Sequence, residues 1–148
     1  MQLDVPVLDL VLDRFVPTLL LMTSTIILAV GVGIVLGLLA ASGLNTWRDT
    51  LISVFALLTY ATPLFWVGLM FIVVFSLNLG WFPTSGMENF AAFYEGWDRV
   101  WDIAHHLVLP TITLSLFYLA LYARLMRASM LEQAGMDYVT TARAKGLT

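Results

Sequence analysis

Long uncharged stretches dominate the pattern of hydrophobic and polar positions along this chain. Asp, Glu, Lys and Arg are absent from residues 15–47, 51–87 and 107–123. A helix needs roughly 20 consecutive apolar residues to cross a bilayer, and each stretch can provide one, the last with its flanking residues included. The pattern therefore predicts an all-α integral membrane helical bundle, with three transmembrane spans at about 17–41, 51–77 and 107–127.

Small residues recur at every fourth position of the first predicted span, at Ala29, Gly33, Gly37 and Ala41. On a helix these positions form one face that is nearly bare backbone, so that another helix can approach closely, as membrane helices do when they associate. Glycine is also common in membrane helices in general, which is the alternative explanation. We interpret the stripe as a helix-packing face because it continues over four positions.

Pro63 interrupts the second predicted span, within Tyr60-Ala-Thr-Pro63. Proline has no N–H and leaves the carbonyl of Thr59 without its helical partner, so we expect a kink near mid-membrane. The hydroxyls of Thr59 and Thr62 are well placed to bond freed backbone groups. Such a kink forms a pathway wall or hinge, or it is a merely structural bend, and the sequence favours neither interpretation.

The segment between the second and third spans, residues 78–106, is a predicted outer loop that opens with LGWFPTSG. Apolar residues then recur at helical spacing with acidic residues between them, at Phe90, Phe93, Tyr94, Trp97, Val100, Trp101 and Ala104. This pattern predicts an amphipathic helix resting on the membrane surface, with a cap over the outer mouth of a pathway as the alternative. Within it, His105 and His106 point in different directions on a helix and have no suitably spaced third ligand, so we expect no metal site.

Composition and charge agree with a membrane protein and give its orientation. Hydrophobic residues make up 60% and charged residues 11% of the chain, with a mean hydropathy of +0.90. The net charge of -3 gives no reason to expect nucleic acid as a partner, and the chain has no cysteine. Short loops rich in Lys and Arg stay cytoplasmic, so we predict an outside N-terminus and a cytoplasmic C-terminus. The basic residues on the predicted cytoplasmic side are Arg48, Arg124, Arg127, Arg143 and Lys145.

A polar segment, residues 132–148, follows the third span on the predicted cytoplasmic side. Gly135 interrupts the helical pattern, Asp137 is a suitable N-cap, and Gly146 can end a helix that begins at Tyr138. A helix of about eight residues is marginal in water and needs a surface to lie on. Its small and basic face suits a partner's groove, although a solvated loop fits the composition equally well. That face carries Tyr138, Ala142 and Lys145.

No catalytic residues can be assigned from the sequence. The chain has no phosphate-binding GxxxxGK[ST] loop and no convincing set of nucleophile, base and acid. Its spans also lack paired carboxylates, which makes an intramembrane enzyme a poor interpretation. One interpretation of the spans is a non-transporting membrane scaffold that binds partner helices through the glycine stripe.

Several ordered stretches resemble ATP-binding-cassette importer permeases of the dipeptide, oligopeptide and nickel group. DYVTTARAKGLT, preceded by ARLMRASMLEQAG, is similar to the start of the family's cytoplasmic coupling loop; RFVPTLLLM, TPLFWVGL, LGWFPTSG and HLVLPTITL match in order before it. Ala142 and Gly146 stand at the second alanine and the glycine of the family's motif. Thr140 and Thr141 stand where the motif has its acidic residue and first alanine. The resemblance covers nearly all of the chain from Arg14 onward.

The resemblance implies a bacterial or archaeal plasma-membrane subunit that couples ATPase subunits to alternating access. Its expected partners are a second permease subunit, two cytoplasmic ATPase subunits that hold ATP and Mg, and an extracytoplasmic substrate-binding protein, with no cofactor on this chain itself. Peptides, nickel complexes and glutathione are candidate solutes. Family members also have further spans, so we expect this chain to represent the middle portion of a longer subunit. The coupling residues implied by the resemblance are Asp137, Tyr138, Thr140, Thr141, Ala142, Arg143, Ala144, Lys145 and Gly146.

Overall fold

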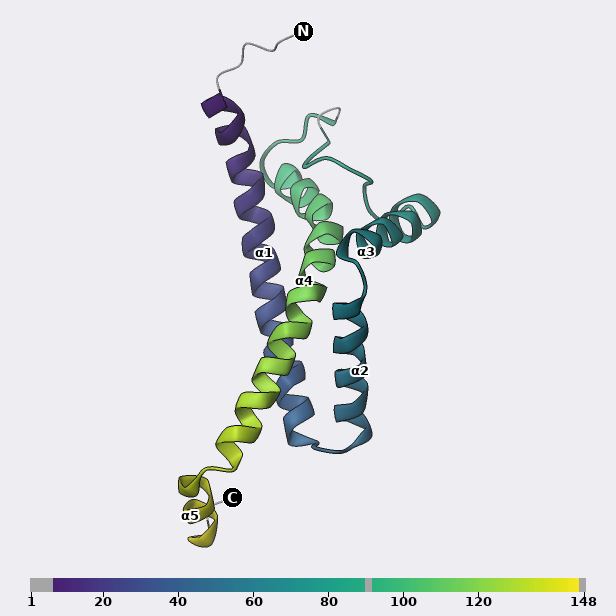
Figure 1. The fold of residues 1–148 in the computed structure, drawn as a ribbon. Helices are drawn as coiled ribbons and strands as arrows, with labels where there is room; N and C mark the ends of the chain where they lie inside the picture. Colours follow the sequence, from purple (N-terminus) through teal and green to yellow (C-terminus); the bar gives the residue numbers. More distant parts are fainter. Residues whose placement is uncertain (1–6, 90–91, 147–148) are drawn as a thin grey trace. The chain divides into compact units, whose positions relative to one another are not determined.

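The computed structural model describes residues 7–89 and 92–146, and its regular elements are helical throughout. In chain order they are α1 (Val7–Ser42), α2 (Trp47–Ala61), α3 (Leu64–Phe71), the π-helical segment η1 (Ile72–Asn78), α4 (Gly96–Ala134) and α5 (Asp137–Ala144) (Figure 1). No strand occurs within these described ranges, and the predicted all-α class is confirmed.

Helices α1 and α4 are each long and apolar enough to cross a membrane. The pair formed by α2 and α3–η1 adds a third crossing if it counts as one broken span, so the described residues contain two to three candidate spans. Large apolar side chains remain uncovered along them, such as Ile27 of α1 at 68% exposure and Leu125 of α4 at 59%. Such surface suits lipid or neighbouring helices, and the membrane helical bundle predicted from the sequence is confirmed.

The predicted surface helix and the third predicted span form one continuous helix, α4, which differs from the separate elements expected. No glycine occurs between Trp97 and Ala134, and the single proline, Pro110, removes only one backbone donor, so the helix has no point at which to end. Trp97 and Trp101 in its first turns are 86% and 78% exposed. Phe90, which the pattern placed on the same helix, lies outside the described residues.

The chain forms two compact units. One comprises the described parts of residues 1–27 and 63–115, and the other those of residues 28–62 and 116–148. In the first unit, the hydroxyls of Ser24 in α1 and Thr111 in α4 lie 2.9 Å apart. The Thr113 methyl carbon lies 3.4 Å from the position that a Cβ on Gly68 of α3 would occupy. Small and hydroxyl side chains therefore hold the helices of this unit together.

In the second unit, α4 packs closely on the glycine face of α1. A Cβ added to Gly33 would lie 2.7 Å from the Tyr122 Cβ, and one on Gly37 would lie 2.6 Å from the Met126 Cβ. Ala29 is fully buried, while Ala41, at the end of the stripe, is half-buried. The core of this unit consists of alanines, namely Ala29, Ala40, Ala56, Ala120 and Ala123, with Leu119. Because Gly33 and Gly37 have no side chain, α4 packs closer to the backbone of α1 than larger residues would allow.

Candidate functional site

The C-terminal helix α5 begins and ends at identifiable backbone positions. Met136 is its N-cap, with φ −71° and ψ 149°, so the helix begins at Asp137 and the expectation that Asp137 itself would be the cap is wrong. The reason is local: Gly135 and Met136 donate their N–H groups to the carbonyls of Glu132 and Gln133, which completes the turn one residue earlier. At the other end, Gly146 has φ +82°, the left-handed conformation that commonly follows a helix C-terminus.

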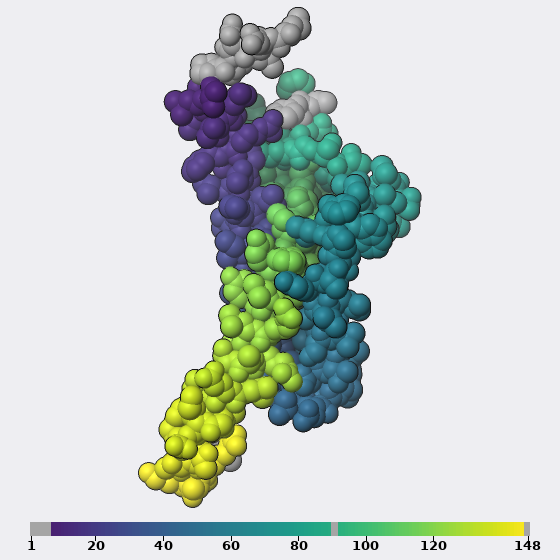
Figure 2. Space-filling model, viewed as in Figure 1, coloured from purple at the N-terminus to yellow at the C-terminus, as the bar shows by residue number. Residues whose placement is uncertain are grey.

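None of the α5 residues is buried, and Tyr138 is 62% exposed. In the space-filling view the α5 segment, in yellow, lies uncovered at the end of its unit (Figure 2). Val139 and Ala142 are half-buried, whereas Arg143, Ala144 and Lys145 are exposed. An eight-residue helix with so little covered surface is marginal by itself in water.

Three α5 side chains are engaged within the chain's own C-terminal segment. The Tyr138 hydroxyl donates to the Gln133 side-chain oxygen at 2.7 Å, which connects α5 to the end of α4. The Thr141 hydroxyl donates to the Asp137 carbonyl at 2.8 Å, and that of Thr140 to the Met136 carbonyl at 3.5 Å. The hydroxyls of both threonines are therefore bonded to their own helix backbone.

An ion pair that the sequence interpretation missed lies between the start of α2 and the C-terminal part of α4. Arg127 donates through Nε and Nη2 to the two carboxylate oxygens of Asp49, at 2.7 and 2.8 Å. The Asn45 N–H, in a residue with φ +60°, and the Ser53 hydroxyl also donate to Asp49. The sequence did contain a signal, because an acid and a base occur at two span ends that were predicted on the same side.

Arg124, one turn before Arg127 on α4, makes a different contact. Its guanidinium carbon lies 5.0 Å from the ring centroid of Tyr60, in the last turn of α2. The Tyr60 ring also stacks on Phe117 of α4, with centroids 5.4 Å apart and an interplanar angle of 19°. The sequence placed Arg124 and Arg127 together among the basic residues of the predicted cytoplasmic side, whereas the structure gives them separate partners.

The predicted kink is a full break between two helices. Thr62 and Pro63 both have extended backbone angles, with ψ 131° and 126°, so α2 ends at Ala61 and α3 begins at Leu64. Proline disfavours helical angles in the residue before it, which explains why the break includes Thr62. The hydroxyls of Thr59 and Thr62 donate to the carbonyls of Phe55 and Leu58, one turn back. Neither hydroxyl therefore bonds the Thr59 carbonyl that Pro63 deprives of a partner.

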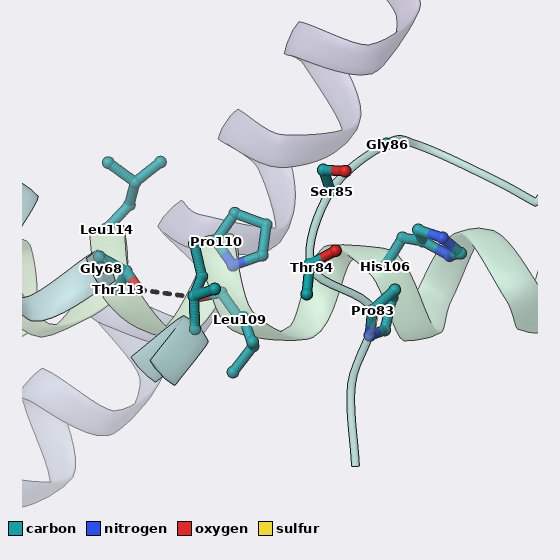
Figure 3. Close-up of a pocket in the computed structure, with 11 residues that line it drawn as sticks. Gly68, Pro83, Thr84, Ser85, Gly86, His106, Leu109, Pro110, Thr113 and Leu114 are labelled. Atoms are coloured by element: carbon teal, nitrogen blue, oxygen red, sulfur yellow. Dashed lines mark hydrogen bonds between the residues drawn. The ribbon is translucent and has the colours of Figure 1, made fainter. Parts of the chain in front are cut away.

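The first unit contains a cavity of about 330 Å³ between α3–η1, the loop at residues 83–86 and α4 (Figure 3). Its wall on α4 runs from His106 through Leu109 and Pro110 to Leu114, and Gly68 of α3 lines it beside Thr113. The Thr113 hydroxyl donates to the Leu109 carbonyl at 2.8 Å, so its hydrogen is used within α4. Thr84 and Ser85 supply the other hydroxyls, which makes this a mostly apolar cavity with a few polar groups.

The loop after η1 is tied to the first turns of α4 by polar contacts. Arg99 donates to both carboxylate oxygens of Glu88, at 2.6 and 3.0 Å. These hydrogen bonds hold the pKa of Glu88 below its usual range. The Asn89 N–H donates to Asp102 at 2.6 Å. These contacts fix the loop that forms one wall of the cavity.

The two adjacent histidines bond backbone oxygens. His105 Nε2 lies 2.8 Å from the Trp81 carbonyl oxygen, and His106 Nδ1 lies 2.8 Å from that of Asp102. Across residues 7–89 and 92–146, no group of three or more His, Cys, Asp or Glu side chains is arranged to hold a metal ion. The structure thus gives both rings a structural role.

Comparison with known proteins identifies the family. Residues 33–148 match the family described as the binding-protein-dependent transport system inner membrane component. The oligopeptide transport system permease protein AppB of Bacillus subtilis is 40% identical over 141 residues, covering 95% of this chain and 43% of that protein. A putative peptide permease protein of Brucella ovis is 41% identical over 138 residues, covering 93% and 42%.

A probable peptide ABC transporter permease protein of Sinorhizobium fredii is 39% identical over 142 residues, covering 96% of this chain and 44% of that protein. The chain therefore spans less than half the length of these curated relatives. The family match extends from the glycine face of α1 through α5, and so includes the ion pair of Asp49 and Arg127. The chain belongs to the family of binding-protein-dependent transport system inner membrane components.

Proposed function

We propose that this chain is part of the membrane-spanning subunit of an ATP-driven importer, and that α5 is the helix through which ATPase subunits act on it. One observation carries the proposal: α5 is a short helix at the end of a long membrane helix, and none of its residues is buried. A helix of that length gains stability from a partner surface. The family membership supports a transport role for the subunit.

Peptides are the first candidate solutes. The names of the three relatives refer to peptides or oligopeptides, and together they support this class for the present chain. Nickel complexes and similar small solutes are further candidates, which the likeness to this permease group allows. A substrate-binding protein on the outer side would deliver the solute, and a second permease subunit would complete the path through the bilayer.

ATP hydrolysis would take place on cytoplasmic ATPase subunits that hold ATP and Mg. The face of α5 that carries Tyr138, Ala142 and Lys145 would enter a groove of an ATPase subunit, and movement of that subunit would be carried into α4. The hydrogen bond from Tyr138 to Gln133 and the paired side chains of Asp49 and Arg127 lie along this route. A change at α5 would in this way alter the positions of α4 and α2, and with them the side from which the path is open.

Two substitutions test the role of α5 in the complete transporter reconstituted in lipid vesicles. Ala142→Glu adds a charge to the face proposed to enter the groove, and Gly146→Pro forbids the backbone angle observed at φ +82°. Both should abolish peptide uptake and peptide-stimulated ATP hydrolysis, while the subunit still reaches the membrane. Normal uptake by either variant would contradict the proposed role of α5.

Thr50→Glu is a matched control. It adds the same charge to an exposed position in the first turn of α2, on the side also predicted to be cytoplasmic. It should keep uptake near the level of the unmodified protein. A non-transporting scaffold would instead retain its partners when residues 137–148 are deleted, so co-purification of an ATPase before and after this deletion distinguishes the two functions.

A further inference from the structure

Arg124 is a cation without a carboxylate partner in the described part of the chain. The ion pairs there join Arg99 with Glu88, His106 with Asp102, and Arg127 with Asp49. Arg124 is exposed, and its guanidinium lies over the Tyr60 ring, 5.0 Å from the ring centroid. A cation over an aromatic face keeps most of its N–H groups available for another ligand.

The guanidinium of Arg124 points away from the predicted cytoplasmic end of α4. Side chains of a helix tilt toward its N-terminus, which for α4 is the predicted outer end. The contacts agree with this direction: Arg127 reaches Asp49 in the first turn of α2, whereas Arg124 reaches Tyr60 in the last turn. Asp49 and Tyr60 are about 16 Å apart along α2 at the usual rise of about 1.5 Å per residue.

A lipid headgroup is a poor partner for a cation placed in this way. Arginines near a helix end normally extend toward the interface, and Arg124 extends toward the middle of the predicted span instead. Charged groups within the membrane are costly in lipid, and they face the bundle interior or a water-filled cavity. The cation of Arg124 therefore belongs to a hydrated or polar space, which in a transport subunit is the path of the solute.

We propose that Arg124, held on the Tyr60 ring, binds a carboxylate of the transported solute within the translocation path. The guanidinium is planar and offers parallel donors that match a carboxylate in two-point binding. Stacking of Tyr60 on Phe117 fixes the ring that positions it. This inference rests on the proposed function, because a peptide carries such a group at its C-terminus.

Equilibrium binding to the full-length permease pair, in phosphatidylcholine vesicles and without the binding protein, tests the inference. The probes are a tripeptide with a free C-terminal carboxylate and the same tripeptide with a C-terminal amide. The unmodified protein should bind the free acid about tenfold more tightly, the factor expected for one charged hydrogen-bonded contact. Arg124→Gln should remove this preference, and Arg124→Lys should keep part of it.

Arg48→Gln is the matched control, since Arg48 also lies over an aromatic ring, that of Trp47 at 5.8 Å, but at the start of α2. It should keep the preference, whereas Tyr60→Leu should weaken it through a change that removes no charge. Equal binding of the two tripeptides by the unmodified protein, or an unchanged preference in Arg124→Gln, would overturn the inference. So would a preference that disappears in phosphatidylglycerol vesicles, because the cation would then be bound to lipid headgroups.

Uptake by the complete transporter separates this inference from the proposed function. Uptake by the unmodified protein combined with equal binding of acid and amide would overturn the carboxylate site alone. Absence of ATP-dependent uptake of every peptide would overturn peptide import, and the assignment of Arg124 to a peptide carboxylate would fail with it.

Discussion

Asp49 and Arg127 are 78 residues apart in the sequence and meet through two hydrogen bonds of 2.7 and 2.8 Å. The Asp49 side chain is only 8% exposed and that of Arg127 31%. Because the Asn45 N–H also donates to the same carboxylate, the turn after α1, the start of α2 and the C-terminal part of α4 are held at one point. Arg127 lies in α4, the helix that α5 follows in the chain.

Asp49→Asn should lower the free energy of unfolding of the purified protein by about 1–3 kcal/mol. The amide cannot accept both Arg127 bonds, and a mostly covered guanidinium would lose its compensating charge. Unfolding by a denaturing detergent, followed by circular dichroism, measures the change.

The exchanged pair Asp49→Arg with Arg127→Asp should recover part of this stability, because opposite charges again face one another. Glu132→Gln removes an exposed acid near the end of α4 and should change stability by less than about 0.5 kcal/mol. Equal losses in Asp49→Asn and Glu132→Gln would show that the pair contributes no specific stabilisation.

Gly37→Ala should destabilise the helix pair by about 1–3 kcal/mol. The new Cβ would lie 2.6 Å from the Met126 Cβ and 2.7 Å from the Ala123 carbonyl oxygen, so α4 would have to move away. Gly31→Ala is the matched control, since its Cβ would meet nothing within 4 Å. It should leave stability unchanged or raise it by less than about 1 kcal/mol, because alanine is the better helix former. The same unfolding assay checks both, and equal effects would contradict a specific packing role for Gly37.

The helical class and the membrane spans followed from the sequence because length and hydropathy alone determine them. Uncharged stretches marked α1 and the core of α4, and the resemblance to importer permeases agreed with the family found. The boundaries of the helices were harder to predict from the sequence. Nothing in the pattern showed that the surface segment from Gly96 continues into the third span, because amphipathic and fully apolar parts of one helix differ in composition but not in backbone.

Side-chain partners were not predictable in the same way. The contact of Asp49 with Arg127 and that of Tyr60 with Arg124 depend on how two helices are rotated about their axes, which an apolar stretch does not specify. Pro63 did indicate an interruption, but its neighbours determine whether a helix bends or breaks. Here Thr62 takes extended angles, so α2 ends instead of bending.

The contact between Glu88 and Arg99 should make the loop after η1 sensitive to acid. The pKa of Glu88 is lowered from its ordinary value of 4.5, first by the Arg99 hydrogen bonds, with Asp102 opposing and His106 adding to the effect. A carboxyl whose pKa is lower in the folded state contributes its stabilisation above the unfolded value, and loses it as the pH falls through the folded value. The protection factor of amide hydrogen exchange near residue 88, from which the intrinsic pH dependence of exchange has been divided out, should therefore stay constant from pH 7 to about the ordinary pKa of glutamate and fall below it. Arg99→Gln should lower the protection factor at pH 7 and give a smaller acid effect; an unchanged acid effect would contradict the role assigned to the contact between Glu88 and Arg99.

Substitutions of Gly146 test the backbone conformation at the end of α5 separately from side-chain contacts within the chain. Its φ is +82° and a Cβ there would meet nothing within 4 Å, so substitution affects conformation alone. Gly146→Val should cost about 1–2 kcal/mol locally, because a branched L-residue is strained at positive φ, while Asn adopts it more readily. Hydrogen exchange of the Lys145 and Gly146 amides, which donate to Thr141, Ala142 and Arg143, measures this loosening. If α5 is the coupling helix, peptide-stimulated ATP hydrolysis should fall in Gly146→Val and be largely kept in Gly146→Asn. Equal losses in both variants would mean that the glycine is required for close contact with a partner instead of for its backbone angle.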